Sequence, residues 1–429
     1  MNIAELENQL EGELQRGRFE QAEPLSKQLL SRKPESIPGL RVAWMAAMQR
    51  GQFAQALPHL GRLAEQLPDD IETLGSLGLA AFECGEPGRA REAFAQALRL
   101  DPGNLPGLVY YGLSCERLGD NQQAASAFLR AQRIAEMTGA RQLPPNLRGP
   151  MNHASEFVRH QLADFIAGRL QPLKSQYGDQ AVARIQGAAD IFTGHRAPDF
   201  AHPQLRPGLA YIPDLPVRMF FEREEFSWVT RLEEARDDIL EELLTVLGED
   251  TGFKPYINHP AGTRKAHEWK DLNQSMDWAS LHLYRHGQRI EENCARCPKT
   301  SAVIESLDLH RVPGYTPEVM FSVLRPHSRI PVHTGSVNGR LVVHLPLIVP
   351  ENCGALRVAD EQRAWQEGEC MIFDDAFKHE AWNDSDDTRV VLILDTWNPD
   401  LSQAEREAFS QMLCAARAFE KELLDLQPA

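Results

Sequence analysis

The chain of 429 residues is longer than one ordinary compact domain, so two or three domains are expected. Its composition, 42% hydrophobic and 25% charged, is typical of a soluble globular protein and excludes disordered and fibrous classes. The formal net charge of −16 argues against nucleic-acid binding, which needs clustered lysine and arginine. No apolar run is long enough to span a membrane, the acidic N-terminus is unlike a secretory signal, and the seven scattered cysteines are unlike a disulfide framework. A cytoplasmic, reducing location is therefore predicted.

Residues 1–140 contain a repeat with a period of 34 residues. Three kinds of position recur at this spacing: a glycine (Gly17, Gly51, Gly85, Gly119), an alanine (Ala22, Ala56, Ala90, Ala124) and a proline (Pro34, Pro68, Pro102). The glycine permits a tight turn, the alanine lets two helices approach closely, and the proline ends the second helix. The pattern resembles the tetratricopeptide repeat, which implies an α-helical solenoid that binds a peptide, protein or partner domain. The less favoured alternative is an unrelated helical bundle with chance periodicity.

The rest of the chain changes character twice. Residues 141–205 mix proline-containing loops with a helical stretch around 153–186, and we expect them to form a connector. A loop entry followed by one long amphipathic helix is expected within residues 218–247. Short β-rich runs separated by turn residues then predict an antiparallel sandwich or jelly roll within residues 206–400. Residues 401–429 are expected to form a C-terminal helix.

Three polar residues, His333, His379 and Arg389, stand in these runs where apolar residues are expected. Two histidines followed by a basic residue is the order expected of a 2-oxoglutarate dioxygenase, in which the basic residue binds the distal carboxylate of the co-substrate. A single histidine at a strand end is more often a hydrogen-bonded surface or core residue. The usual iron site of two histidines and one carboxylate would also need an acidic residue at Gly335.

The residues around these positions resemble the aspartyl/asparaginyl β-hydroxylase family. The family's motifs occur in order as FSVL (321–324), HTGSVNGRLVVHL (333–345), WQEGECMIFDDAFKHEAWN (365–383) and RVVLILDTWNP (389–399). The resemblance implies a double-stranded β-helix that uses Fe(II), 2-oxoglutarate and O2 to hydroxylate an Asp/Asn-like side chain. The substrate would be a peptide, protein or carrier-bound group recruited by the repeats. The alternatives are a hydroxylase of a lipid or small metabolite, and a non-catalytic interaction scaffold.

The resemblance also implies roles for individual residues. The Fe(II) ligands would be His333 and His379, and the residues that bind the co-substrate would be Ser322, Arg340, His344 and Arg389. Arg389 would pair with one carboxylate of 2-oxoglutarate, with help from Ser322, and His344 would contact the carboxylate near the metal. A glycine replaces the third metal ligand in this family, as Gly335 does here, and the predicted consequence is weaker resting metal affinity.

Two positions differ from the mammalian members. Val342 stands where those members have a second basic residue, and Met320 lies near the position of a lysine. The pocket therefore has fewer cations for an acidic substrate, although Arg340 remains available.

Other polar and aromatic residues are given structural interpretations. Cys294 and Cys297 are interpreted as plain thiols in preference to a redox pair or half a zinc site. Asp374 or Asp375 could be the missing carboxylate ligand, but adjacent strand residues point to opposite faces, so at most one of them could face the metal. A turn, or support of His379, is the favoured interpretation for both. Trp365 is assigned to core packing.

Overall fold

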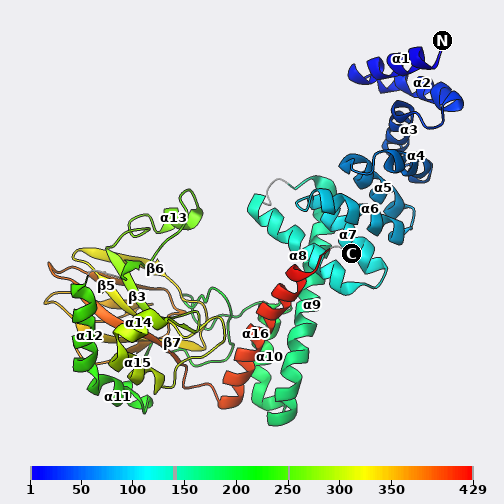
Figure 1. Ribbon diagram of the computed structural model, residues 1–429. Coiled ribbons are helices and arrows are strands. Elements are labelled where there is room, and N and C mark those ends of the chain that lie inside the picture. The colour runs from blue at the N-terminus through cyan, green and yellow to red at the C-terminus, as the bar shows by residue number, and fades with distance from the viewer. Residues whose placement is uncertain (1, 139–142, 250–251, 428–429) are drawn as a thin grey trace. The chain divides into compact units, whose positions relative to one another are not determined.

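The computed structural model describes residues 2–138, 143–249 and 252–427. The chain divides into two compact units (Figure 1). The repeat unit comprises Met1–Leu162 with Ala418–Ala429, and the sheet unit comprises Ala163–Arg417.

The repeat unit is built from consecutive pairs of helices. These are α1 (Ile3–Gln15) with α2 (Phe19–Arg32), α3 (Ile37–Gln49) with α4 (Phe53–Gln66), α5 (Ile71–Glu83) with α6 (Pro87–Leu100), and α7 (Leu105–Arg117) with α8 (Asn121–Thr138). The four repeated glycines lie between the members of each pair with φ of 69° to 77°, a conformation that glycine adopts without steric conflict. The four repeated alanines have no exposed surface. The predicted helical solenoid is therefore confirmed.

Two long helices contain residues of both units, α9 (Pro145–Tyr177) and α16 (Gln403–Asp425). The end of α16 covers the last repeat, because Ser126 Oγ donates a hydrogen bond to the Leu423 carbonyl at 2.6 Å. The predicted boundary between residues 140 and 141 lies outside the described residues, as does the end of the predicted C-terminal helix. The other domain boundaries stay predictions.

The sheet unit contains two antiparallel sheets. The larger sheet has the order β1-β10-β7-β12-β5-β3-β2, with β4 paired to β3, and the smaller sheet has the order β6-β11-β8-β9. The strands of the two sheets are β1 (Phe220–Phe221), β2 (Lys254–Pro255), β3 (Trp278–Arg285), β4 (Gln288–Arg289), β5 (Val319–Leu324), β6 (Ser328–His333), β7 (Arg340–Ile348), β8 (Leu356–Val358), β9 (Glu361–Arg363), β10 (Met371–Phe373), β11 (His379–Asn383) and β12 (Arg389–Trp397). Two antiparallel sheets with flanking helices confirm the predicted β architecture, and the jelly-roll topology stays an interpretation of this pair.

Helices flank the larger sheet. The helices of this unit are η2 (Asp179–Val182), α10 (Ala183–Phe192), η3 (Arg223–Glu225), α11 (Val229–Glu234), α12 (Arg236–Gly248), α13 (Arg264–Glu268), α14 (Glu291–Arg296) and α15 (Pro298–Glu305). The prediction of one long helix within 218–247 is wrong, because the chain turns at Ala235 between α11 and α12. This turn lets Leu232 and Leu243 both reach the core against the sheet.

Alternation along the strands separates two cores. Leu341, Val343 and Leu345 of β7 pack in the cluster shared with the helices, whereas Val342 belongs to the cluster shared with the smaller sheet. The same alternation directs every second residue of β7 toward the space between the sheets. In the described part of the chain, no helix is both long and apolar enough to cross a membrane.

Candidate active site

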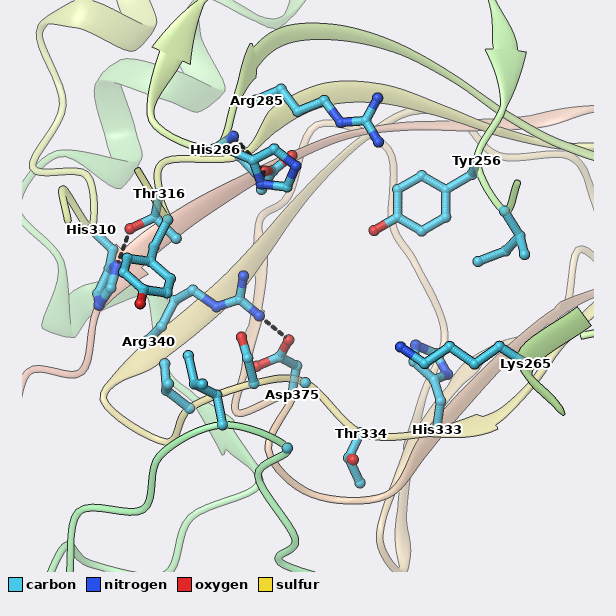
Figure 2. Close-up of a pocket in the computed structure, with 18 of the residues that line it drawn as sticks. Tyr256, Lys265, Arg285, His286, His310, Thr316, His333, Thr334, Arg340 and Asp375 are labelled. Carbon is cyan, nitrogen blue, oxygen red and sulfur yellow. Dashed lines mark hydrogen bonds and ion pairs between the residues drawn. The ribbon is translucent and has the colours of Figure 1, made fainter. Parts of the chain in front are cut away.

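Two connected hollows lie in the sheet unit. The inner chamber has a volume of about 110 Å³ and is lined by residues of both sheets, including Ser322 on β5, His344 on β7 and Arg389 on β12. The outer cavity has a volume of about 680 Å³ and shares lining residues such as His333 and Arg340 with the chamber. Figure 2 shows labelled residues around this outer cavity.

The two predicted metal ligands meet across neighbouring strands of the smaller sheet. His379 of β11 pairs in register with His333 of β6, and their ring centroids are 4.0 Å apart. The Nδ1 atoms lie 2.8 Å and 2.9 Å from the carbonyl oxygens of Pro331 and Phe377, respectively. A carbonyl oxygen can only accept a hydrogen bond, so each Nδ1 carries the hydrogen and donates it, and each Nε2 keeps a lone pair suited to a metal.

Burial keeps both imidazoles neutral. It lowers the pKa of His333 to about 3 and that of His379 to about 4. A neutral imidazole is the form that binds a metal ion, so neither ring must lose a proton at neutral pH. The pair therefore fits a divalent cation with nitrogen ligands.

A carboxylate occupies the space beside Gly335. A Cβ at this position would lie 2.0 Å from Asp375 Oδ2, so the chain has no room there for the usual third ligand. Asp375 forms an ion pair with Arg340, drawn in Figure 2, and Arg340 also reaches Asp395 at 3.3 Å. Among the described residues, no group of three or more His, Cys, Asp or Glu side chains is placed to hold a metal ion. The structure brings the two predicted ligands, His333 and His379, together, and their role as metal ligands stays a prediction.

The neighbouring aspartate has a different setting. Asp374 Oδ1 accepts a hydrogen bond from the Ala376 backbone N–H at 2.9 Å, which fits the expected turn before His379. The Cys294 and Cys297 thiols are buried and are not joined by a disulfide.

Arg389 lies at the deep end of the inner chamber with almost no exposed surface. Its Nε and Nη1 are buried and, among the described residues, meet no hydrogen-bond acceptor. Burial lowers the pKa of Arg389 to about 10, and the guanidinium carbon lies 4.6 Å from the centre of the Trp365 ring. A buried guanidinium without an anionic partner is destabilising unless a ligand supplies one.

Two tryptophans set the hydrogen-bonding roles of the residues beside Arg389. Trp278 Nε1 donates to Ser322 Oγ at 3.1 Å, which leaves the serine hydroxyl proton for another acceptor. Trp365 Nε1 donates to His344 Nδ1 at 3.2 Å, so the proton of the neutral imidazole is on Nε2. Burial holds the pKa of His344 well below its ordinary value. Ser322, His344 and Arg389 therefore offer hydrogen-bond donors suited to a dicarboxylate.

Arg340 lies at the other end of the chamber, where it also lines the outer cavity. Burial opposes its charge, but Asp375 and Asp395 outweigh this effect and raise the pKa of Arg340. Its guanidinium is already compensated by two carboxylates, and its role in co-substrate binding stays a prediction.

Sequence reasoning missed several residues of the site. Trp365 was assigned to the core, yet it contacts both His344 and Arg389. Trp278 lies on β3 and contacts Ser322, but it was not among the predicted site residues. Glu318 was also missed, although its position two residues before Met320 placed it on the chamber side of β5.

Comparison with known proteins identifies both parts of the chain. A family model described as aspartyl/asparaginyl beta-hydroxylase matches residues 233–399, and a tetratricopeptide repeat model matches residues 45–104 and 76–136. The chain is 34% identical over 145 residues to the aspartyl/asparaginyl beta-hydroxylase of Homo sapiens, covering 33% of this chain and 18% of that protein. It thus spans about a fifth of the length of the human and mouse proteins of that name.

Two other relatives are matched over more of their length. The chain is 31% identical over 219 residues to aspartate beta-hydroxylase domain-containing protein 2 of Homo sapiens, covering 49% of this chain and 56% of that protein. It is 35% identical over 208 residues to the ornithine lipid ester-linked acyl 2-hydroxylase of Rhizobium tropici, covering 48% of this chain and 70% of that protein. These matches confirm the predicted resemblance: the chain belongs to the aspartyl/asparaginyl β-hydroxylase family and carries N-terminal tetratricopeptide repeats.

Proposed function

We propose that the protein is an Fe(II)- and 2-oxoglutarate-dependent hydroxylase. The observation that carries this proposal is the buried Arg389 guanidinium, which lacks an anionic partner among the described residues and lies in the same chamber as two neutral, oriented histidines. One carboxylate of a dicarboxylate would pair with Arg389 at the deep end of the chamber. The second carboxylate would then lie beside the two histidines.

The residues present fit both groups. His333 and His379 would hold the iron through Nε2, and Arg389 would bind the distal carboxylate of 2-oxoglutarate with Ser322, while His344 donates from Nε2. Bound iron, with O2 and 2-oxoglutarate, supplies chemistry that converts a substrate C–H to C–OH and yields succinate and CO2.

The protein's own contribution is position and exclusion of water. The backbone carbonyls of Pro331 and Phe377 fix the orientation of the two imidazoles before any ligand binds. The inner chamber, about 110 Å³, is too small for both the co-substrate and a whole substrate, so most of the substrate must occupy the outer cavity and only its reacting segment would enter the chamber. Binding there would close the chamber to bulk water.

The substrate that we propose is an amino-acid side chain in a peptide, protein or carrier-bound molecule. The outer cavity is large enough to accept an extended segment, and tetratricopeptide repeats ordinarily bind peptides or partner domains. The repeats would recruit the substrate and raise its local concentration at the site.

A second candidate is hydroxylation of an acyl chain. Met320, Val342 and Ile393 form an apolar layer of the chamber between its two polar ends. This layer suits an aliphatic group, and one relative is named as an acyl 2-hydroxylase.

Succinate formation from 2-oxoglutarate by the full chain with Fe(II) tests the proposal. We expect iron-dependent succinate in the presence of a peptide pool or a lipid pool, and loss of at least about 100-fold in His379→Ala, since a metal ligand is removed. The matched control is His327→Ala, because the ring of His327 is exposed and contacts Asp386 at 3.0 Å. The control should keep full turnover. Absence of iron-dependent turnover with every pool would favour the non-catalytic scaffold.

A further inference from the structure

The charges at the outer end of the inner chamber indicate which charge a substrate should carry. Residues 318, 320 and 322 lie on one face, because side chains two apart along a strand point the same way, and all three line the chamber. Ser322 lies at the co-substrate end, Met320 in the apolar layer, and Glu318 where the chamber meets the outer cavity. From the co-substrate end outward, the lining of the chamber therefore changes from a hydroxyl to an apolar side chain and then to a carboxylate.

Among the described residues that line the chamber, no unpaired cation lies beyond the co-substrate end to meet a carboxylate substrate. Met320 and Val342 are uncharged, and Arg340 is compensated by Asp375 and Asp395. An aspartyl or glutamyl side chain would therefore lie among existing carboxylates without a partner of its own, an arrangement that is unfavourable in a buried site.

Among the described carboxylates that line the two hollows, Glu318 is the one without a lysine or arginine partner. Within the described residues, Oε1 accepts from the His286 backbone N–H at 2.6 Å and Oε2 lies 3.5 Å from His282 Nε2, but no lysine or arginine lies within ion-pair distance. The His286 ring is 3.2 Å away. Burial lowers the pKa of His282 to about 4, so this ring carries no charge at neutral pH. Burial raises the pKa of Glu318 to about 7, and a cation from the cavity that meets this side chain, 21% exposed, would stabilise its ionised form.

Aromatic rings lie beside this carboxylate. Tyr256 and Trp278 line both hollows with their ring centroids 4.2 Å apart, and Trp269 lies 5.9 Å from Trp278 on the outer cavity. Aromatic faces attract alkylammonium groups, and a carboxylate next to them adds a charge-assisted hydrogen bond. Figure 2 shows that Lys265 and Arg285 also border the outer cavity. Both are exposed, so solvent and salt screen their charges more than that of Glu318.

We propose that the substrate presents an amine to Glu318 beside Tyr256 and Trp278, while an aliphatic segment passes Met320 and Val342 toward the metal histidines. This inference rests on the proposed hydroxylation, because it names the substrate class of that same site. The substrate class is an aliphatic amine, such as a lysine-like or ornithine-like side chain or a lipid headgroup amine.

Three probes with the same backbone and different side chains distinguish the effect of side-chain charge on binding from the effect of side-chain shape. They are the N-acetyl N-methylamides of lysine, norleucine and glutamate, titrated by NMR into the metal-free full chain. We expect the lysine probe to bind about 10- to 100-fold more tightly than the norleucine probe, since a charge-assisted hydrogen bond contributes about 1.5–3 kcal/mol. The glutamate probe should bind most weakly. Lipid vesicles with and without an amine headgroup then distinguish a lipid source from a peptide source.

Substitution of Glu318 tests whether this residue is the cause of tighter binding of the lysine probe than of the norleucine probe. Glu318→Gln should reduce the lysine-to-norleucine ratio to about one without changing norleucine binding, which also shows that the variant is folded. The matched control is Glu268→Gln, another carboxylate of the outer cavity, which is paired with Arg264. It should keep the wild-type ratio.

Several results would overturn the inference: equal or tighter binding of the glutamate probe, an unchanged ratio in Glu318→Gln, or no binding of any probe. Iron-dependent succinate formation without amine selectivity would refute this inference alone. Amine selectivity without succinate formation from any pool would refute the proposed hydroxylation and leave the amine site standing.

Discussion

Replacement of Gly335 by alanine tests whether the carboxylate of Asp375 takes the space of a third ligand. The new Cβ would lie 2.0 Å from Asp375 Oδ2 and 2.2 Å from Cγ, whereas non-bonded heavy atoms prefer about 3.5 Å. The backbone has little freedom to retreat, because Gly335 N–H donates to the Asp375 carbonyl at 2.6 Å and Gly208 N–H donates to the Gly335 carbonyl at 2.9 Å. The Asp375 side chain must therefore move.

That movement would be costly in free energy. Asp375 is buried, and its displacement weakens the ion pair with Arg340, itself 12% exposed. Overpacking of a buried site costs about 1–3 kcal/mol, and a lost hydrogen bond to a charged group about 1.5–3 kcal/mol. We expect Gly335→Ala to lower the free energy of unfolding of the sheet unit by about 2–5 kcal/mol.

Urea unfolding followed by tryptophan fluorescence measures this change. Of the seven tryptophans, only Trp44 belongs to the repeat unit, so the signal reports mainly on the sheet unit. The matched control is Gly208→Ala, whose Cβ would meet the Gly335 carbonyl oxygen at an ordinary 3.6 Å and should cost less than about 1 kcal/mol.

The exchange of the two side chains gives the sharper result. Gly335→Asp combined with Asp375→Gly moves the carboxylate from the β10–β11 turn to the loop after β6 and keeps a partner for Arg340, so it should recover at least half of the stability lost in Gly335→Asp. A Gly335→Ala variant within about 0.5 kcal/mol of wild type, or an exchange no better than the sum of its parts, would refute the reasoning.

Three further predictions concern other parts of the chain. Arg389→Met should weaken 2-oxoglutarate binding, measured by calorimetry, about 10- to 100-fold. It should leave the unfolding midpoint unchanged or raised, because it removes a buried charge that lacks a partner among the described residues. A lower midpoint with intact binding would contradict this. Burial raises the pKa of Glu318 to about 7, so the folded state holds this proton more tightly than the unfolded state, and stability should fall as pH rises from about 4.5 through 7. Glu318→Gln should remove on the order of 2 kcal/mol of that fall, measured as unfolding midpoints at pH 5 and pH 8, and parallel curves would disprove it. In the repeats, Gly112→Ala should destabilise by about 1–3 kcal/mol because its Cβ would lie 2.4 Å from the Phe128 ring, whereas Gly75→Ala, with open space, should stabilise slightly in thermal melts.

The sequence predicted those features that recur or that occur in a fixed order. The repeat helices follow from one glycine and one alanine per unit, because the turn and the close helix contact depend on local geometry alone. The strands that carry His333 and Arg389 were visible as short apolar runs between turn residues. Their pairing partners were less visible, since β3 reads as a mixture of aromatic and polar residues although it is buried inside the larger sheet.

The environment of each side chain could not be obtained from spacing. Nothing in the order of residues indicates that the Asp375 carboxylate fills the space beside Gly335, forty residues earlier, because this contact depends on how the β10–β11 turn meets the end of β6. The donor roles of Ser322 and His344 likewise depend on two tryptophans that are distant in sequence. Sequence order predicts which residues converge, and three-dimensional packing decides which of their atoms remain free.

Strand alternation explains how a site of this kind can keep its chemistry while its substrate changes. Each of β5 and β7 places its chamber-facing residues two apart, so Ser322 and His344 lie at the co-substrate end while Met320 and Val342 lie one step further out. A substitution at the outer step alters the charge that a substrate meets without moving the donors of the inner step. The uncharged side chains at Met320 and Val342 are therefore expected to affect substrate choice more than co-substrate binding, and the proposed amine site at Glu318 lies one step further out on the same face.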